Sequence, residues 1–274
     1  MKKHLSTIIL ILIFLMGLAL VLYPTVADYW NSLHQSRAIA TYAEEVAHID
    51  TDQYAALWQT AVAYNQSLRE RDNIFILSDE QKAAYDDLLN IGGNGVMGYI
   101  EIPAIGVSLP VYHGTDEAVL QIAIGHLEWT SLPVGGESSH CVVSGHTGLP
   151  SAKLFTNLNQ LVAGDTFLFR ILDETLTYEV DQIKIVLPRE TDDLLVEEGK
   201  DLCTLVTCTP YGVNSHRLLV RGHRVENAEI AKTIRVTADA MQIEPFIVAP
   251  LVAAPMLLIL LIKVMFSSGK KKGG

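Results

Sequence analysis

Thr204-Leu-Val-Thr-Cys208-Thr-Pro-Tyr-Gly-Val-Asn-Ser-His-Arg217-Leu-Leu-Val220 is the stretch that decides the fold of this chain. It holds two apolar runs separated by Pro, Gly and Asn, a pattern that predicts two neighbouring strands joined by a loop. Cys208 stands where the first strand ends, and Arg217 stands where the second begins. The sequence therefore brings a thiol and a fixed positive charge to one end of a sheet.

A third apolar run, further upstream, ends on a histidine. The segment Cys141-Val-Val-Ser-Gly-His146-Thr-Gly148 places His146 at a strand end, just before turn residues. Imidazole exchanges protons near neutral pH, so His146 is a candidate acid and base beside a cysteine nucleophile. A cysteine, a histidine and an arginine together indicate nucleophilic acyl transfer. His126, His216 and His223 are the competing histidines.

The three cysteines have different sequence surroundings. Cys208 precedes Thr209-Pro210-Tyr-Gly212, which ends its strand, so its sulfur is expected at a rim where a neighbouring cation can stabilise the thiolate. Cys141 and Cys203 lie inside apolar runs and are expected to be small buried side chains.

Arg217 is the candidate for binding a substrate carbonyl or the oxyanion that forms when sulfur attacks it. A guanidinium stays charged at any relevant pH and presents a planar set of donors. Arg221 and Arg224 are the alternatives, and both are further from Cys208 in the sequence.

Most of the chain after Met97 alternates between apolar and polar residues. Period two predicts strands, which Gly, Pro, Asn and Asp separate. Seven or eight short strands, with helix expected only at 116–124 and 154–161, predict a mainly β fold that is a closed barrel or a sandwich. The expected strands cover 98–103, 107–112, 141–144, 166–171, 176–186, 202–207 and 217–225.

The region before these strands has a different pattern. Residues 33–71 carry apolar side chains three and four positions apart, which predicts two amphipathic helices with a break at Asp50-Thr-Asp52. Residues 72–95 are first acidic and then rich in Gly and Asn, which predicts a flexible segment with a short helix from Glu80 to Leu89.

An apolar run lies near each terminus. Leu5 to Tyr23 is long enough to cross a hydrocarbon layer of about 30 Å as a helix, and Phe246 to Ile262 is the second such run. Pro250 and Pro255 would kink the second helix without preventing it from spanning. Lysines flank the terminal side of both runs, so both termini are expected in the cytoplasm and the middle of the chain outside. Thr25-Val-Ala27 leaves open a signal-peptidase site as the alternative.

The charge distribution excludes some classes of partner. The chain has a net charge of −11, and residues 28–245 alone carry 31 acidic against 14 basic residues, a net charge of −17. Such a surface argues against nucleic acid and anionic lipid as partners. An odd number of cysteines indicates a free thiol in an extracytoplasmic domain, and the absence of Cys-x-x-Cys spacing argues against structural zinc. No metal and no cofactor are expected.

Three stretches of this chain closely resemble the sortase family and, within it, the pilus-assembling enzymes of class C. They are Gly125-His-Leu-Glu-Trp-Thr-Ser-Leu-Pro-Val-Gly-Gly136, Ser144-Gly-His-Thr-Gly-Leu-Pro-Ser-Ala-Lys-Leu-Phe155 and Thr204 to Arg224. The resemblance runs from about Ser36 to Glu226 and includes both membrane segments. Class C members have a C-terminal anchor and a long helical N-terminal region, whereas housekeeping sortases usually carry only an N-terminal anchor.

The resemblance implies an eight-stranded β-barrel in which His146, Cys208 and Arg217 match the family's catalytic residues. The implied partners are pilins or surface proteins that carry an LPxTG-like sorting signal, cleaved between Thr and Gly. The acyl-enzyme would then be resolved by a lysine amine of the next pilin, giving an isopeptide bond, with slow hydrolysis by water as a competing reaction. The implied location is the plasma membrane of a Gram-positive cell, with the catalytic domain outside.

The chain departs from class C at the lid, which usually carries an Asp-Pro-aromatic motif. In that motif the aspartate contacts the catalytic arginine and the ring contacts the cysteine. This sequence contains no Asp-Pro, and the expected region offers Asp72-Asn-Ile-Phe75, with one extra residue between carboxylate and ring. Asp72 and Phe75 are the lid candidates.

The expected organisation has six parts. They are an N-terminal transmembrane helix (1–27), an extracytoplasmic helical region with the candidate lid (28–95), the catalytic barrel (96–228), a linker (229–244), a C-terminal transmembrane helix (245–266) and a basic cytoplasmic tail (267–274).

Two other functions remain open on the sequence. One is a sortase that attaches surface proteins to cell-wall peptidoglycan, which differs only in the amine it accepts. The other is a catalytically idle membrane-tethered scaffold, which the presence of Cys208, His146 and Arg217 together disfavours.

Overall fold

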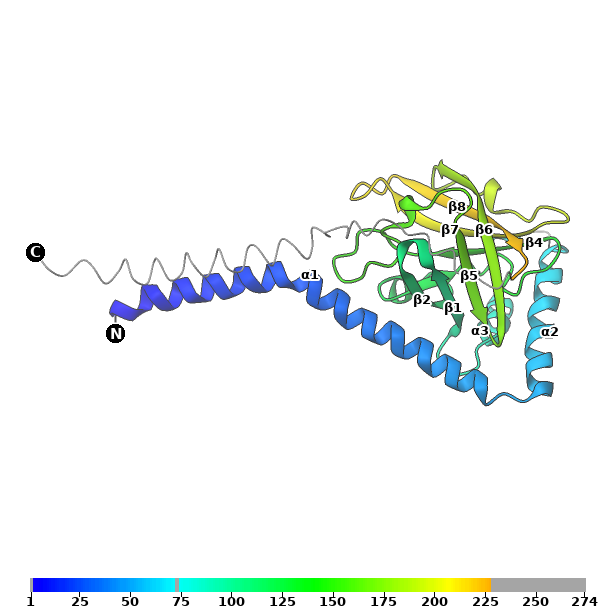
Figure 1. Ribbon diagram of the computed structural model, residues 1–274, viewed down its shortest axis with the longest axis horizontal. Coiled ribbons are helices and arrows are strands. Elements are labelled where there is room, and N and C mark those ends of the chain that lie inside the picture. The colour runs from blue at the N-terminus through cyan, green and yellow to red at the C-terminus, as the bar shows by residue number, and fades with distance from the viewer. Residues whose placement is uncertain (1, 72–73, 228–274) are drawn as a thin grey trace, which may run out of the picture. The chain divides into compact units, whose positions relative to one another are not determined.

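The computed structural model describes residues 2–71 and 74–227. Eight strands close into a barrel in the order β1-β2-β3-β4-β7-β8-β6-β5, with β5 pairing back onto β1 (Figure 1). This confirms the predicted mainly β, closed eight-stranded architecture with helices ahead of it. The strands are β1 (Val96–Ile102), β2 (Val107–His113), β3 (Ile124–His126), β4 (Ser139–Ser144), β5 (Thr166–Ile171), β6 (Glu174–Val186), β7 (Asp201–Thr209) and β8 (His216–Val225).

Two of the strand pairs are parallel, and this arrangement determines which loops meet. β2 pairs with β3, and β4 pairs with β7, in parallel, while the remaining neighbours are antiparallel. A parallel pair needs a long crossover, and the connection from β4 to β7 passes through β5 and β6. The carboxyl ends of β4 and β7 therefore lie next to each other, although they are far apart in the sequence.

The barrel interior is filled by alternate residues of every long strand. Phe167, Phe169 and Tyr178 form a group of mutually packed rings, with centroid separations of 5.6 to 6.3 Å. Residues at the intervening positions of β4, β7 and β8 face outward and form a second, smaller apolar cluster with Leu194. The period-two pattern of the sequence thus separates an inner and an outer set of side chains.

The short elements between the strands differ in part from the expectation. The predicted helix at 116–124 is wrong in extent, because only α4 (Glu117–Leu120) is helical, and Ile124 begins the short strand β3. A three-residue strand is too short to show an alternating pattern. The segments η1 (Pro103–Ile105), η2 (Leu158–Gln160) and η3 (Asp192–Leu194) are single 3₁₀ turns.

The first helix spans two of the predicted segments. α1 (Lys2–Ala47) continues through Pro24, so the predicted membrane segment and the first predicted amphipathic helix belong to one helix. Its C-terminal part is fixed to the barrel by Tyr42, whose hydroxyl donates to the carbonyl oxygen of Met97 at 3.1 Å and accepts from the amide of Leu172 at 2.7 Å. The helix break predicted at 50–52 comes directly after α1. There the side chain of Asp50 caps α2 (Thr51–Leu68) by accepting from the amide of Gln53 at 2.8 Å.

Helices α2 and α3 (Asp79–Asp87) lie beside the barrel (Figure 1) and share its core. Asn65 of α2 forms two hydrogen bonds with the backbone of Leu132, at 2.7 and 3.1 Å. Tyr85 of α3 is buried, and its hydroxyl contacts Nδ1 of His126 at 2.9 Å. Both helices are therefore held against the loop that joins β3 to β4.

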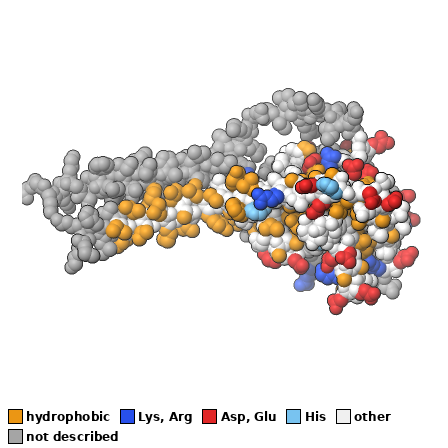
Figure 2. All heavy atoms as spheres, turned by 90° about the horizontal axis from the view of Figure 1, so that it is seen from below, with side chains coloured by type: hydrophobic (Ala, Val, Ile, Leu, Met, Phe, Trp, Pro, Cys, Tyr) orange, Lys and Arg blue, Asp and Glu red, His pale blue; other side chains and the backbone are white. Residues whose placement is uncertain are grey.

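The described N-terminal part of α1 is long and apolar enough to cross a membrane. Figure 2 shows hydrophobic side chains along this part of the helix and acidic side chains spread over the surface that contains the barrel. Residues up to Trp30 belong to a compact unit separate from Asn31–Ala231. The second predicted span, at 245–266, lies outside the described residues.

Candidate active site

Cys208 and Arg217 are directly opposite each other on neighbouring antiparallel strands. The register of β7 and β8 pairs Cys208 with Arg217 and Thr209 with His216. Directly opposite residues point to the same face with their Cβ atoms about 4.5–5.5 Å apart. Cys208 is half-buried, so its thiol can be reached from solvent. The guanidinium of Arg217 donates to the carbonyl oxygen of His216 at 3.1 Å, which holds it close to the strand.

His146 reaches the same place through the parallel pair of β4 and β7. The last paired residues are Ser144 and Val206, and the amide of Gly145 donates to the carbonyl oxygen of Val206 at 3.0 Å. The hydroxyl of Thr207 then donates to the carbonyl oxygen of Gly145 at 2.7 Å. These hydrogen bonds keep the two segments in register as far as Gly145, so the next residue, His146, leaves β4 at the end of the barrel where Cys208 lies. The three residues predicted from the sequence are thus brought to one end of the barrel.

An outward-facing apolar surface leads away from Cys208. Val206 has the same orientation as Cys208, two positions earlier on β7, and packs with Val142 and Leu219 of the adjoining strands. We call this surface the outer cluster; it comprises Leu127, Trp129, Val142, Val186, Leu194, Val206 and Leu219. Its four central members are buried, so a ligand that approaches the thiol would meet the half-buried Leu127, Trp129 and Val186.

Of the two lid candidates, the structure describes Phe75 and not Asp72. Asp72 lies outside the described residues. The ring of Phe75 packs on Trp129 of the outer cluster, with ring centroids 4.9 Å apart and an angle of 59° between the planes. Contact of Phe75 with the sulfur of Cys208 stays a prediction.

The competing histidines have other surroundings. His126 is buried, with Tyr85 at one ring nitrogen and the carbonyl oxygen of Ser131 at 2.8 Å from the other. His223 is near the far end of β8, where Nδ1 is 4.0 Å from Asp181. His216 is level with Thr209, next to Cys208, and its Nδ1 contacts the hydroxyl of Ser215 at 2.9 Å. Of the three, only His216 is close to the thiol along the strands.

The two alternative arginines, Arg221 and Arg224, interact with other side chains. Arg221 forms ion pairs with Asp181 at 2.9 Å and with Glu197 at 2.8 Å. Hydrogen bonding to Asp181 raises the pKa of its guanidinium further. Arg224 lies over the ring of Tyr178, 5.8 Å from the ring centroid.

Cys141 and Cys203 are side by side in the barrel core, at paired positions of β4 and β7. Both are free thiols and buried. Burial raises the pKa of the Cys203 thiol well above its ordinary value. The Cys203 thiol in that state is a poor nucleophile. The burial of both thiols agrees with the prediction that these two cysteines are small core residues.

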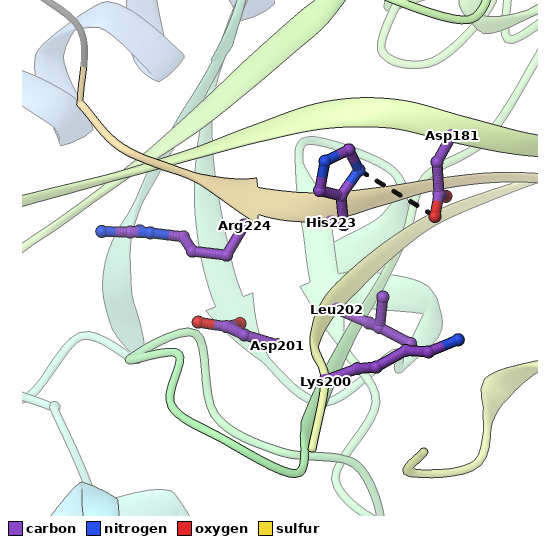
Figure 3. Close-up of a pocket in the computed structure, with 6 residues that line it drawn as sticks. All are labelled: Asp181, Lys200, Asp201, Leu202, His223 and Arg224. Carbon is purple, nitrogen blue, oxygen red and sulfur yellow. Dashed lines mark ion pairs between the residues drawn. The ribbon is translucent and has the colours of Figure 1, made fainter. Parts of the chain in front are cut away.

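A cavity of about 390 Å³ lies at the other end of β7, where Asp201 starts the strand (Figure 3). Its lining mixes both signs of charge, and Figure 3 shows His223 facing Asp181 and Arg224 above Asp201. Seven residues of extended strand, roughly 23 Å, separate Asp201 from Cys208. The lining residues are Asp181, Lys200, Asp201, Leu202, His223 and Arg224. This cavity is therefore not the place where the thiol would react.

Within residues 2–71 and 74–227, no three His, Cys, Asp or Glu side chains come together in a way that could hold a metal ion. The candidate residues at the Cys208 end of the barrel supply a thiol, an imidazole and a guanidinium.

Comparisons with known proteins place this geometry in context. A family model described as the sortase domain matches residues 100–225. Sortase D of Bacillus subtilis is 30% identical over 131 residues, which are 47% of this chain and 63% of that protein, so the match covers less than two thirds of its length. The crystal structure of sortase C1 from Streptococcus agalactiae is similar with a TM-score of 0.68 and 50% identity, covering 70% of this chain and 99% of that chain. Sortase C of Streptococcus pneumoniae is similar with a TM-score of 0.63 and 42% identity, covering 69% and 96%.

Proposed function

Because the chain belongs to the sortase family of cysteine transpeptidases, we propose that it cleaves LPxTG-like sorting signals between Thr and Gly and joins the product to a lysine amine of a pilin. The single observation that carries this proposal is the cross-strand pair of Cys208 and Arg217 with His146 at the same end of the barrel. The similar structures of class C favour pilin polymerisation, and the work on the pneumococcal enzyme concerns pilin substrate specificity.

In the proposed first half-reaction, the Cys208 thiolate attacks the threonine carbonyl carbon and forms a C–S bond. The C–N bond to glycine then breaks, and His146 donates a proton to the departing amine. Arg217 binds the oxyanion of the tetrahedral intermediate. The products are a thioester on Cys208 and a free glycine amine.

In the second half-reaction, a lysine amine attacks the thioester and gives its proton to His146. The C–S bond breaks, an amide forms between threonine and lysine, and the Cys208 thiolate is restored. His146 ends the cycle in the protonation state in which it began, so the reaction needs no metal ion and no cofactor from outside this group of residues.

The outer cluster provides the approach for the sorting signal under this proposal. Its members on β4, β7 and β8 are buried, so an extended substrate would contact the half-buried members Leu127, Trp129 and Val186. Phe75 packs on Trp129 of the same cluster, so a segment that carries Phe75 would compete with the substrate for this surface. We therefore retain residues 72–78 as a candidate lid, with Asp72 directed to Arg217.

We further propose that α1 anchors the protein in the plasma membrane, with the barrel outside the cell. Exposed apolar side chains along the described N-terminal part of α1 support this proposal. The segment at 245–266, which lies outside the described residues, is proposed as the second span, with both termini in the cytoplasm. Lysines at both ends of the chain support this topology.

The proposal is tested by incubating the purified protein with an LPxTG-type peptide and a lysine-containing pilin peptide, followed by mass spectrometry. We expect cleavage between Thr and Gly and a product in which the threonine carboxyl group is joined to the lysine ε-amine. Cys208→Ala is the matched control and should give neither product.

Two outcomes would support the other functions. Transfer only to a short glycine peptide that imitates a cell-wall cross-bridge, with none to lysine, would indicate peptidoglycan attachment. Labelling of Cys208 by a thiol reagent without cleavage of any sorting-signal peptide would indicate a non-catalytic scaffold.

A further inference from the structure

The backbone on both sides of His146 is covered by an aromatic ring. A Cβ atom added at Gly145 would lie 2.8 Å from Cδ2 of Phe155, and one added at Gly148 would lie 2.8 Å from Cε2 of Tyr211. Real Cβ atoms essentially never approach other atoms so closely, so both rings occupy space that only glycine leaves free. Gly148 also has a φ of +74°, in the region that favours glycine. The loop that carries His146 is thus clamped between two rings.

The two rings belong to different parts of the molecule. Phe155 is fully buried in the core, and its amide donates to the carbonyl oxygen of His146 at 3.1 Å. Tyr211 is 58% exposed and comes from the loop between β7 and β8, three residues after Cys208. The contact of Tyr211 with Gly148 therefore joins the loop that follows Cys208 to the loop that follows His146.

We propose that Tyr211 is a positioning residue, whose ring on Gly148 fixes the imidazole of His146 relative to the thiol of Cys208. This inference rests on the function proposed above and deepens it. The atoms of Tyr211 nearest to Gly148 are Cε2, Cζ and Cδ2, so one edge of the ring makes the contact. The ring is needed for this role and the hydroxyl is not.

A positioning role has a specific kinetic signature. Proton transfer and nucleophilic attack require reacting atoms about 3–3.5 Å apart, and a displacement of about 1 Å can reduce the rate on the order of 10²-fold. The sorting signal would still bind the outer cluster, which Tyr211 does not belong to. Loss of the ring should consequently lower kcat and leave KM nearly unchanged.

The test uses the full chain and a fluorogenic LPxTG-type peptide. Tyr211→Ala should lower kcat on the order of 10- to 100-fold with KM within about twofold, and Tyr211→Phe should restore kcat to within about twofold of the wild type. Val213→Ala is the matched control, because Val213 lies in the same loop and is 70% exposed. It should leave both constants unchanged.

A double-mutant cycle identifies the contact itself. Gly148→Ala places a methyl group against the ring and should lower kcat in the wild-type background. With Tyr211→Ala present, the methyl group no longer meets a ring, so the additional loss should be clearly smaller. Backbone strain at φ +74° affects both backgrounds equally and cancels in the comparison.

A second measurement does not depend on turnover. The rate at which a thiol reagent modifies Cys208 should vary with pH in a way that depends on His146, and Tyr211→Ala should shift this profile towards that of His146→Ala. Equal kcat and identical alkylation profiles for the wild type and Tyr211→Ala would overturn the inference. So would additive effects in the double-mutant cycle. Failure of the wild type to cleave any sorting-signal peptide would instead refute the proposed function, and the alkylation profile would still decide the role of Tyr211.

Discussion

Two cysteines on one strand differ in surroundings although only five positions separate them. Cys203 points into the barrel core and is completely buried, whereas Cys208 is half-buried at the strand end beside Arg217. Reactivity requires an accessible thiolate, so position on the strand, and not residue type, determines which of the two can act as a nucleophile.

Cys208→Ala should abolish cleavage of an LPxTG-type peptide and polymer formation, because no thioester can form. The fold should persist, since a half-buried residue at a strand end contributes little packing. Cys203→Ala should retain the chemistry and lose some thermal stability, because it leaves space in the core. Mass spectrometry of the products and thermal unfolding of both variants check this pair, and cleavage by Cys208→Ala would show that another group is the nucleophile.

Arg217→Lys should reduce turnover strongly although the positive charge is kept. A guanidinium can donate two aligned hydrogen bonds to an oxyanion, whereas an ammonium acts as a compact point charge. Loss of one oxyanion donor typically lowers the rate on the order of 10²–10³-fold. Steady-state kinetics with Arg221→Lys as a control should separate the roles, because Arg221 is ion-paired to Asp181 and Glu197. Near-native turnover in Arg217→Lys would assign the oxyanion to backbone amides or to another arginine.

The residues of the candidate site could be named from the sequence because each stands where a strand pattern meets a turn. Cys208, His146 and Arg217 all follow or precede an apolar run directly. The contact of Tyr211 with Gly148 could not be predicted in this way. A ring packed on a glycine 63 positions away leaves no periodic signal, and it becomes visible only once the parallel pair of β4 and β7 brings the two loops together.

At the scale of elements, the segment that leads into α3 is fixed at its C-terminal end. Its far end is defined by a capping box, in which Gln81 and Ser78 exchange hydrogen bonds at 2.9 and 3.2 Å. Lys82 in the first turn of α3 forms an ion pair with Glu128 at 2.7 Å, next to Trp129 in the sequence. A segment held so near the outer cluster can cover it without a large rearrangement.

Phe75→Ala should increase the rates of Cys208 alkylation and of peptide hydrolysis. An aromatic pair contributes about 0.5–1.5 kcal/mol, so loss of the contact with Trp129 should ease opening by about 2- to 12-fold. Ile76→Ala is the control, because Ile76 is 72% exposed. Deletion of residues 72–78 should increase both rates further, and unchanged rates in the deletion variant would mean that this enzyme has an open site.

The elements show where sequence patterns are informative. Long alternating runs predicted the strands β5 to β8 near their observed positions. The predicted membrane segment (1–27) and the first predicted amphipathic helix, from residue 33, lie on one continuous helix, α1. Local composition reports the environment of a helix face, and it does not by itself determine where the helix ends.

At the scale of the whole molecule, the buried His140 and the half-buried His113 make stability depend on pH. Burial lowers the pKa of both His113 and His140, against the opposing effect of hydrogen bonds to carbonyl oxygens. The unfolded chain takes up these protons near pH 6.5, before the folded protein does. Stability is therefore fully present above about pH 6.5 and falls as the pH falls below that value, because the unfolded state binds more protons.

Thermal or urea unfolding between about pH 7.5 and pH 5.5 should show this loss of stability. His140→Asn should make the dependence on pH shallower, since it removes one titrating group and keeps a polar side chain near Thr204 and Leu195. His48→Asn, at an exposed position, should leave the slope unchanged. An equal slope for His140→Asn and the wild type would show that other groups control the acid sensitivity.

The strand order has a consequence for the time at which the protein becomes active. Arg217 lies on β8, the last strand in the part of the chain that the structure describes, and β8 is also the strand that joins β7 to β6 and closes the barrel. During synthesis Cys208 emerges before Arg217, and the pairing of β7 with β4 links residues far apart in the chain, such as Ser139 and Asp201, which makes its formation slow. In a newly made molecule, the Cys208 thiol should thus lack the Arg217 guanidinium beside it until β8 has paired and the barrel is closed. Under the proposed function, the pairing of β8 would then be the step after which the thiol can be acylated.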